Sequence, residues 1–585
     1  MIYAFERFAR NVMLVAAGAA LASGGTLADV SSNELAAAVA ADLEQPVRPG
    51  GVNGRPFWNG NGRGMRFIYP PAFGFDEVPG AAQYRFTVMD DLLNEHVFEQ
   101  NRPTADLSPV WKSVPVGFVH VRVEGLSAEG RVLGVSGTRR FWRCAPYEPG
   151  AYPKKPWSYA ECVRRYYPVL FAHQNTQHFL KHGTPDGVTD LLNIYPSKMN
   201  SALVRGLLRY ARLSKEHAAD ALKAAKAAGD FMISISQPDD APLAHFPPTY
   251  RNMENQTSNF ANRQYAGQNM LVYPAVMGQA YLELYAACGE TRYLKAARGI
   301  ADTYARLQLP EGTWYLKMWE RDGRPVANDS GGAPVRLNPI NVCSFMDSLA
   351  EATGERRWHE VSARAFAYIE KGPLTTWDWS AQFEDTAPSS GYRNPASSDA
   401  MLVARYLLKR FPLDGARRAL ARELMRWVED QFVFWRKPCR ADGRSVLSGP
   451  DRGFNPWERP GEPAGRKFTE WVDVPGVAEK YTWMVMENSL AAMMMSLYLD
   501  FYRLEGDQLC RAKAKTLGDS IVRVQQMCGD GEIASEWFAS YMTGMRCPHI
   551  WLNCSVNTIT LLEDAASVDA TPTGTCDILQ APKPK

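Results

Sequence analysis

Hydrophobic and polar residues alternate in three short segments near the start of the chain. These segments are YRFTV (84–88), GFVHVRVEGL (117–126) and TRRFWRC (138–144), and proline- and glycine-rich turns separate them. Strict alternation places the apolar side chains on one face of an extended strand. Several short alternating strands with turn signals between them predict a small β-sandwich over residues 56–146.

From about residue 157 the apolar spacing becomes helical, and one unit recurs along the chain. Each unit reads as the end of one helix, a tight turn and a second helix, and the units begin at residues 207, 281, 345, 406 and 498. A glycine falls at four of the turns, where it suits the left-handed conformation that ends a helix; these are Gly289, Gly354, Gly415 and Gly506. A sixth hairpin can be assembled from residues 157–182 and 548–563. The repeat therefore predicts a mainly α protein, with an (α/α)6 toroid over residues 157–566 and a C-terminal tail over 567–585.

The connections between these hairpins are long, whereas the turns within them are short. Every long connection joins an outer helix to the next inner helix, so we expect all of them at one end of the ring; they span about 237–268, 309–338, 370–395, 434–480 and 528–547. Long loops in a compact domain are usually functional, which makes this end the expected binding site. The MMM run at 493–495 lies in a continuous apolar band and is expected to fill the core.

The N-terminus has the pattern of an export signal. Arg7 and Arg10 precede an apolar run over 12–22, and small residues end at Ala28. The run is short for a membrane anchor, the alternative reading. We predict a signal peptide over 1–28, a linker over 29–55, and export to the periplasm or the extracellular space. The net charge of +2 argues against a general nucleic-acid binder, which would carry a basic surface.

The 10 cysteines are even in number, and an exported chain can form disulfides. Cys144 with Cys162, and Cys547 with Cys554, are the closest candidate pairs, although connectivity cannot be deduced from sequence. The chain has no CxxC pair and no HExxH helix, so a zinc site is not expected, and no cofactor is predicted.

Several motifs resemble known families. The stretch at 73–90 is similar to the opening strands of immunoglobulin-like or fibronectin-type modules. Segments in and around the long loops resemble the six-hairpin glycosidase superfamily, which includes glycoside hydrolases and related polysaccharide lyases; they are PEGTWYLKMWERDGRP (310–325), WDWSAQFEDT (377–386), VPGVAEKY (474–481) and HIWLNCSVNTITLLED (549–564). The resemblance covers most of the chain from residue 157 onward. It implies a carbohydrate-active enzyme whose partner is a polysaccharide or an oligosaccharide.

The long loops carry residue types that suit sugar chemistry. Hydrolysis of a glycosidic bond needs two carboxyl groups, and the candidates are Glu384, Asp385, Glu479 and Asp329. Sugars also stack their apolar faces on aromatic rings, and the candidate platforms are Trp314, Trp377, Trp379 and Trp471. Each tryptophan could instead anchor its loop onto the helices, because large aromatics usually serve packing.

Alternative reactions remain open. A lyase or an epimerase acting on uronates would need a proton-abstracting base and groups that neutralise a carboxylate. The candidates for these contacts and for other substrate contacts are Tyr265, Gln268, Asn269, Arg336, Arg393, Tyr481 and His173. A non-catalytic glycan-binding protein would use the same aromatic residues without paired carboxyl groups. A terpene-cyclase-like toroid is disfavoured, because the chain has neither DDxxD nor DxDD.

Overall fold

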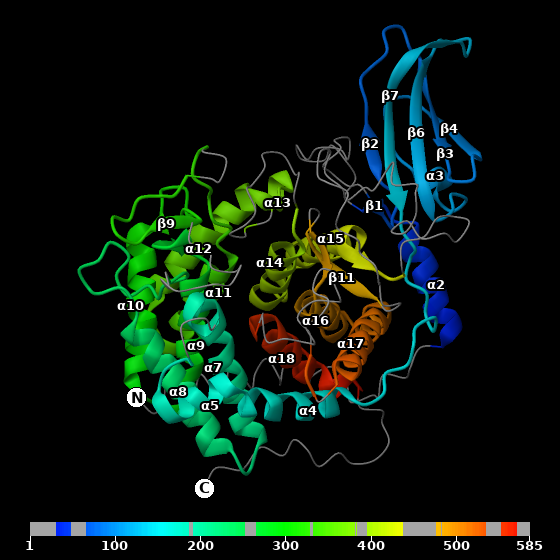
Figure 1. Ribbon diagram of the computed structural model, residues 1–585. Helices are drawn as coiled ribbons and strands as arrows, with labels where there is room; N and C mark the ends of the chain where they lie inside the picture. Colours follow the sequence, from blue (N-terminus) through cyan, green and yellow to red (C-terminus); the bar gives the residue numbers. More distant parts are fainter. Residues whose placement is uncertain are drawn as a thin grey trace.

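The computed structural model describes residues 31–47, 66–186, 191–251, 265–327, 332–380, 382, 395–436, 475–480, 483–529, 531–533 and 552–569. A β domain stands beside a larger helical domain (Figure 1). The predicted signal peptide over 1–28 lies outside the described residues. So does the predicted tail over 567–585, apart from residues 567–569, which are the end of a helix. Among the described helices, none combines the length and the apolar character that crossing a membrane requires.

The β domain contains a five-stranded sheet in the order β1-β7-β6-β3-β4. Its strands are β1 (Arg66–Phe67), β7 (Val132–Arg143), β6 (Gly117–Leu126), β3 (Gln83–Met89) and β4 (Glu95–Gln100). Strand β1 runs parallel to β7, and the other neighbours are antiparallel. A second pair of strands, β2 (Ala72–Gly74) and β5 (Thr104–Asp106), and the short helix α3 (Ser108–Trp111) complete the domain.

The predicted alternation decides which face of this sheet is buried. Every second residue of β3 is buried between partly exposed neighbours, and β6 follows the same pattern over most of its length. The ring centroids of Phe67 and Phe73 lie 5.2 Å and 5.6 Å from that of Phe141, so aromatic rings join β1, β2 and β7. The expectation of a small N-terminal β domain is confirmed to this extent.

The helical domain is built of antiparallel hairpins. The first helix of each pair packs on the second; the pairs are α7 (Pro196–Leu213) with α8 (Ala218–Ser234), α9 (Tyr273–Cys288) with α10 (Thr291–Leu307), α11 (Ile340–Thr353) with α12 (Arg356–Lys371), α14 (Ser397–Arg410) with α15 (Gly415–Phe432), and α16 (Asn488–Glu505) with α17 (Gln508–Cys528). Helix α18 (Leu552–Asp569) packs on α4 (Tyr159–Ala172). This contact brings together the first and last helices of the domain, as the sequence predicted. The mainly helical class is confirmed.

The inner helices form a closed circuit of contacts. Helix α7 contacts α9, and the contacts continue through α11, α14, α16 and α18 back to α7 (Figure 1). The outer helices are amphipathic: α12 buries Trp358, Val361, Ala365, Phe366 and Ile369, which recur at helical spacing on one face. The inner helices are buried on more sides, because helices flank them within the ring and from outside.

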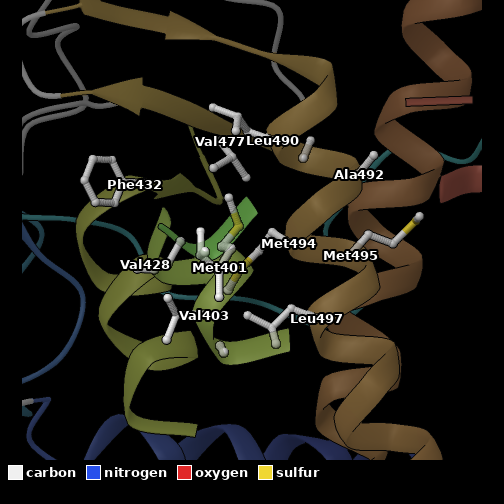
Figure 2. Close-up of a cluster of buried hydrophobic side chains, with 14 of the residues drawn as sticks. Met401, Val403, Val428, Phe432, Val477, Leu490, Ala492, Met494, Met495 and Leu497 are labelled. Atoms are coloured by element: carbon white, nitrogen blue, oxygen red, sulfur yellow. The ribbon is translucent and has the colours of Figure 1, made fainter. Parts of the chain in front are cut away.

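The methionine run belongs to the core, as predicted. Met494 and Met495 are fully buried, and Met494 lies among Met401 of α14 and other apolar side chains between α14, α15 and α16 (Figure 2). Unbranched methionine side chains fill irregular spaces of this kind.

Three of the four predicted glycine turns are confirmed. Gly289, Gly354 and Gly506 end α9, α11 and α16 with φ of 72°, 74° and 72°. The prediction for Gly415 is wrong, because Gly415 is the first residue of α15. The side chain of Asp414 caps that helix by accepting hydrogen bonds from the backbone N–H groups of residues 416 and 417.

The predicted linker contains helix α2 (Ser32–Leu43). Ser31 and Glu34 form a capping box, in which each side chain accepts a hydrogen bond from the other residue's backbone N–H. The alanine-rich stretch that suggested a linker is therefore a capped helix, since alanine has the highest helix propensity.

Both candidate disulfides are wrong. Cys144, Cys162 and Cys554 carry free thiols. Cys144 Sγ instead accepts a hydrogen bond of 3.0 Å from Arg66 Nε, and Cys162 is buried in α4. Cys528 is disulfide-bonded, and its partner lies outside the described residues.

The connections between the hairpins carry the remaining short elements. These are α5 (Gln174–His182), α6 (Leu191–Ile194), α13 (Pro373–Thr376), β8 (Gln268–Met270), β9 (Lys317–Trp319), β10 (Val433–Phe434), β11 (Gly476–Lys480) and β12 (Trp483–Met486). Strands β8 and β9 pair with each other, and β10, β11 and β12 form a three-stranded sheet in that order.

Candidate functional site

Polar residues gather where the inner helices begin. Each inner helix follows a long connection from an outer helix, so all inner helices start at one end of the ring, which we call the loop end. The first turns of α7, α14 and α18 contribute Lys198, Asp399 and Cys554, and Glu487 immediately precedes α16. With Glu479 of β11, these residues are the loop-end cluster, and all five are partly exposed.

Glu479 lies at an irregularity in its strand. Ala478 pairs with Met486 and Lys480 pairs with Trp483, so the register shifts at Glu479. The hydroxyl of Ser397, at the start of α14, donates to the carbonyls of Ala478 and Glu479 at 3.2 Å and 3.3 Å. Irregularities of this kind re-aim side chains and are common beside active sites.

Glu487 is held on three sides. Its backbone N–H donates to Val477 O of β11 at 3.0 Å. Its carboxylate accepts a hydrogen bond from the Ser489 hydroxyl and is hydrogen-bonded to the Cys554 thiol. These contacts fix the orientation of the carboxylate, which a reacting group requires.

Charges surround the Cys554 thiol. Burial, followed by the carboxylate of Glu487, raises the pKa of the thiol well above its ordinary value. Lys198 opposes this rise, and the Glu479 carboxylate adds to it. Cys554 is therefore a neutral hydrogen-bond donor to Glu487 at neutral pH, since a reactive thiolate needs a lowered pKa.

Asp399 has the properties of a proton donor. Burial raises the pKa of this carboxyl to about 7. A carboxyl group with that pKa carries a proton in about half of the molecules at neutral pH. It lies two residues beyond Ser397, whose hydroxyl holds the Glu479 carbonyl.

A second carboxyl group with a raised pKa, Glu320, follows strand β9. Burial raises the pKa of Glu320 to about 7, and a hydrogen bond of 3.2 Å from Asn269 Nδ2 opposes the rise. The same Asn269 amide donates to Pro247 O at 2.9 Å. Asn269 is fully buried, and its amide links Glu320 to the 247–249 loop by hydrogen bonds.

The predicted anion site at residues 262–270 has a different structure. Gln268 and Asn269 lie in β8, whose partner is β9, and α9 begins only at Tyr273. Gln268 and Asn269 therefore do not belong to the first turn of α9, where the prediction placed an anion on free backbone N–H groups. Tyr265 is buried beside Tyr250, with ring centroids 5.4 Å apart, and Lys317 Nζ lies 4.6 Å from the centre of its ring.

The three predicted platform tryptophans within the described part of the chain anchor their loops. Trp314 is fully buried, and its indole N–H donates to Tyr304 O at 2.8 Å. Trp377 and Trp379 are buried with Trp427 of α15, at ring-centroid distances of 6.1 Å and 6.3 Å from it. Their ring faces are covered by protein, which favours the anchoring alternative over an open sugar platform.

The other predicted contact residues are dispersed. Arg336 donates to Glu311 Oε1 at 2.7 Å and lies 4.2 Å above the Tyr315 ring. His173 caps α5, where its Nδ1 accepts from the backbone N–H of Asn175 at 3.3 Å. The remaining predicted residues lie outside the described part of the chain: Glu384, Asp385, Asp329, Trp471, Arg393 and Tyr481.

Glu479 is the one predicted catalytic residue within the described part of the chain, and the structure places it in the loop-end cluster. Sequence reasoning missed Lys198, Asp399, Glu487 and Cys554. A signal was present: each lies within a few residues of the predicted start of an inner helix. Among the described residues, no group of three or more histidine, cysteine, aspartate or glutamate side chains could hold a metal ion.

Comparisons with known proteins gave structural neighbours only. No protein-family model and no curated protein matches the chain. Cellobiose 2-epimerase from Spirochaeta thermophila is similar over 70% of this chain and 99% of its own, with 13% identity and a TM-score of 0.46. A family 76 glycoside hydrolase from a bovine Bacteroides thetaiotaomicron strain is similar over 86% and 98%, with 10% identity and a TM-score of 0.43.

An unsaturated glucuronyl hydrolase specific for heparin is similar over 70% of this chain and 97% of its own, with 11% identity and a TM-score of 0.40.

Proposed function

We propose that this protein is an exported carbohydrate-active enzyme that hydrolyses glycosidic bonds at the loop end of its helical ring. In this proposal the helical domain is an (α/α)6 toroid and the β domain is an immunoglobulin-like sandwich. The observation that carries the proposal is the loop-end cluster itself: Glu479 and Glu487 both act on the Cys554 thiol, and Asp399 lies in the first turn of α14, two residues from the Ser397 hydroxyl that binds the Glu479 carbonyl.

The cluster can supply both carboxyl groups that hydrolysis needs. Asp399 is the general acid, because burial raises its pKa to about 7 and it can give a proton to the leaving oxygen. Glu487 is the second carboxyl group, since Ser489 and Cys554 hold it in one orientation. Glu479 orients substrate hydroxyls beside it, and the cationic Lys198 suits polymers that contain uronic acids.

A second candidate reaction is β-elimination from a uronate. The Lys198 ammonium lies 5.9 Å and 5.6 Å from the ring centres of Tyr195 and Tyr273. In that reaction Lys198 would neutralise the substrate carboxylate, and the partly exposed Tyr273 would abstract the neighbouring proton. Epimerisation at the same carbon would begin with the same step.

Incubation with a panel of neutral and uronate-containing glycans tests these reactions. Release of reducing ends without the ultraviolet absorbance of unsaturated uronates supports hydrolysis. Reducing ends together with that absorbance identify a lyase, and a change of sugar configuration without chain cleavage identifies an epimerase. Binding without any product on the whole panel would reject the enzyme in favour of a glycan-binding protein.

A further inference from the structure

The first strand of the β domain is attached to the end of helix α15 by a buried polar network. The Asp430 carboxylate accepts hydrogen bonds from the backbone N–H groups of Ile68 and Tyr69 at 2.6 Å and 2.9 Å. The Arg66 guanidinium donates to Gln431 O at 3.3 Å and to Val433 O at 2.5 Å. Arg66 and Asp430 are each 1% exposed.

This network ends on the sheet that carries the candidate carboxylates. Val433 belongs to β10, which is an edge strand of the sheet β10-β11-β12, and it pairs with Val477 of β11. Glu479 lies two residues after Val477. Val477 O also accepts the backbone N–H of Glu487 at 3.0 Å. A single strand, β11, thus sets the position of both glutamates, and Arg66 holds the strand beside it.

The contacts from the β domain fix both residues of strand β10. The Arg66 guanidinium lies 3.8 Å above the Phe434 ring, and the Gln431 amide donates back to Arg66 O at 3.0 Å. Both residues of β10 are therefore fixed from the β-domain side, one through its carbonyl and one through its ring. An edge strand of two residues has few hydrogen bonds of its own, so this external support determines where it lies.

We propose that Arg66 and Asp430 are positioning residues for the catalytic carboxylates, and that the β domain is a structural part of the active site rather than a separate binding module. This inference rests on the proposed function. Loss of the Arg66 contacts lets β10 and β11 shift, and a displacement of about 1 Å at a reacting group can cost about 100-fold in rate.

The test measures kcat and KM of the full chain carrying Arg66→Met on a glycan that the wild type cleaves. We expect kcat to fall about 10- to 100-fold through displacement of Glu487, and KM to rise less than that through displacement of Glu479, which orients substrate hydroxyls. Arg66→Lys keeps one of the hydrogen bonds, so its kcat should fall less than that of Arg66→Met. Arg209→Met is the matched control: it removes a half-buried arginine from the opposite end of the ring, and its kcat should equal that of the wild type.

A double substitution separates positioning from general destabilisation. If Arg66 acts on kcat through Glu487, Arg66→Met together with Glu487→Gln should lose little more kcat than Glu487→Gln alone. Multiplicative losses, or an unchanged kcat in folded Arg66→Met, would overturn the inference. If Arg66→Met does not fold, the same cycle is measured with Arg66→Lys. An inactive wild type would instead reject the proposed function.

Discussion

The two ends of the helical ring both carry charged residues on the inner helices, but they use them differently. At the end away from the long loops, charges of opposite sign meet across neighbouring helices. Arg205 of α7 pairs with Glu283 of α9 at 3.0 Å, and Arg405 of α14 pairs with Asp500 of α16 at 2.8 Å. Arg209 of α7 donates to Glu563 of α18 at 3.0 Å.

In the described part of the loop end, the loop-end cluster contains more carboxyl groups than cations. Asp399, Glu479 and Glu487 are accompanied in the loop-end cluster by one cation, Lys198, and by a thiol whose pKa the two glutamates raise. Like charges placed together cost stability, so a purely structural cluster would not be expected to contain them. The comparison teaches that neighbouring helices are joined by matched pairs at one end, whereas the cluster at the other end carries an excess of carboxyl groups, which is the basis of the proposed active site.

The strongest test of this contrast is Glu487→Gln. Glutamine keeps the size of the side chain and its contacts with Ser489 and Cys554, but it cannot act as base or nucleophile. We expect kcat on a cleaved glycan to fall about 1,000-fold, within the range for loss of an acid–base group. Thermal melting monitored by circular dichroism should change little. Retention of full activity would remove Glu487 from the mechanism.

Asp399→Asn tests the proton donor. Since a general acid must be protonated, wild-type activity should decline as the pH rises through about 7, where Asp399 titrates. The variant should lose about 100-fold in kcat near neutrality and should lack this decline in its pH–rate profile. A profile with the same alkaline limb in both proteins would assign the limb to another group.

The same substitution should stabilise the protein at alkaline pH. The folded pKa of Asp399, about 7, exceeds the unfolded value, so the folded state binds more protons in between. Its free energy of unfolding therefore falls as the pH rises from about 4 to about 7, and the penalty is complete above 7. Asparagine has no carboxyl group to deprotonate, so the Asp399→Asn variant does not lose this stability.

Asp399 is partly exposed, so solvent weakens the effect of its titration. We therefore expect Asp399→Asn to raise the free energy of unfolding by about 1–2 kcal/mol at pH 8 and not at pH 4. Urea unfolding at the two pH values measures the difference. An equal change in stability at both pH values would show that the change does not come from titration of the Asp399 carboxyl group.

Arg209→Met probes the paired end and should have the smallest effect. The guanidinium bonds Glu563 and Asp564 in a partly exposed ion pair, so its loss should cost about 1 kcal/mol or less. Activity should be unchanged. A large loss of kcat in a folded variant would mean that both ends of the ring contribute to the chemistry.

Much of the helical architecture was predictable because its signals are local. The recurring hairpins, the left-handed glycines at 289, 354 and 506, and the buried methionines follow from residue spacing and backbone preference. Gly415 was misread because a glycine near a turn can begin a helix as well as end one. Helix α2 was missed because overall composition was considered before its capping box.

The candidate site was predicted only in part. Loop lengths led to the prediction of a binding site at the loop end, and Glu479 was selected among the loop carboxyl groups. The tryptophans of the loops were harder to interpret, because sequence does not show whether an aromatic ring faces solvent. Trp314, Trp377 and Trp379 are covered in the structure.

The sequence by itself determined the hairpin repeat, the alternating strands and the end of the ring at which long loops gather, since these depend on neighbours a few residues apart. Tertiary structure alone decided which carboxyl groups meet. Glu479 of β11 and Glu487, which precedes α16, both act on the Cys554 thiol of α18. Only burial raises the pKa of Asp399 to about 7. Likewise, only packing connects Arg66 to β10, the strand that pairs with the Glu479-bearing strand β11. Burial and distance between remote segments are properties of the folded chain, and no local pattern encodes them.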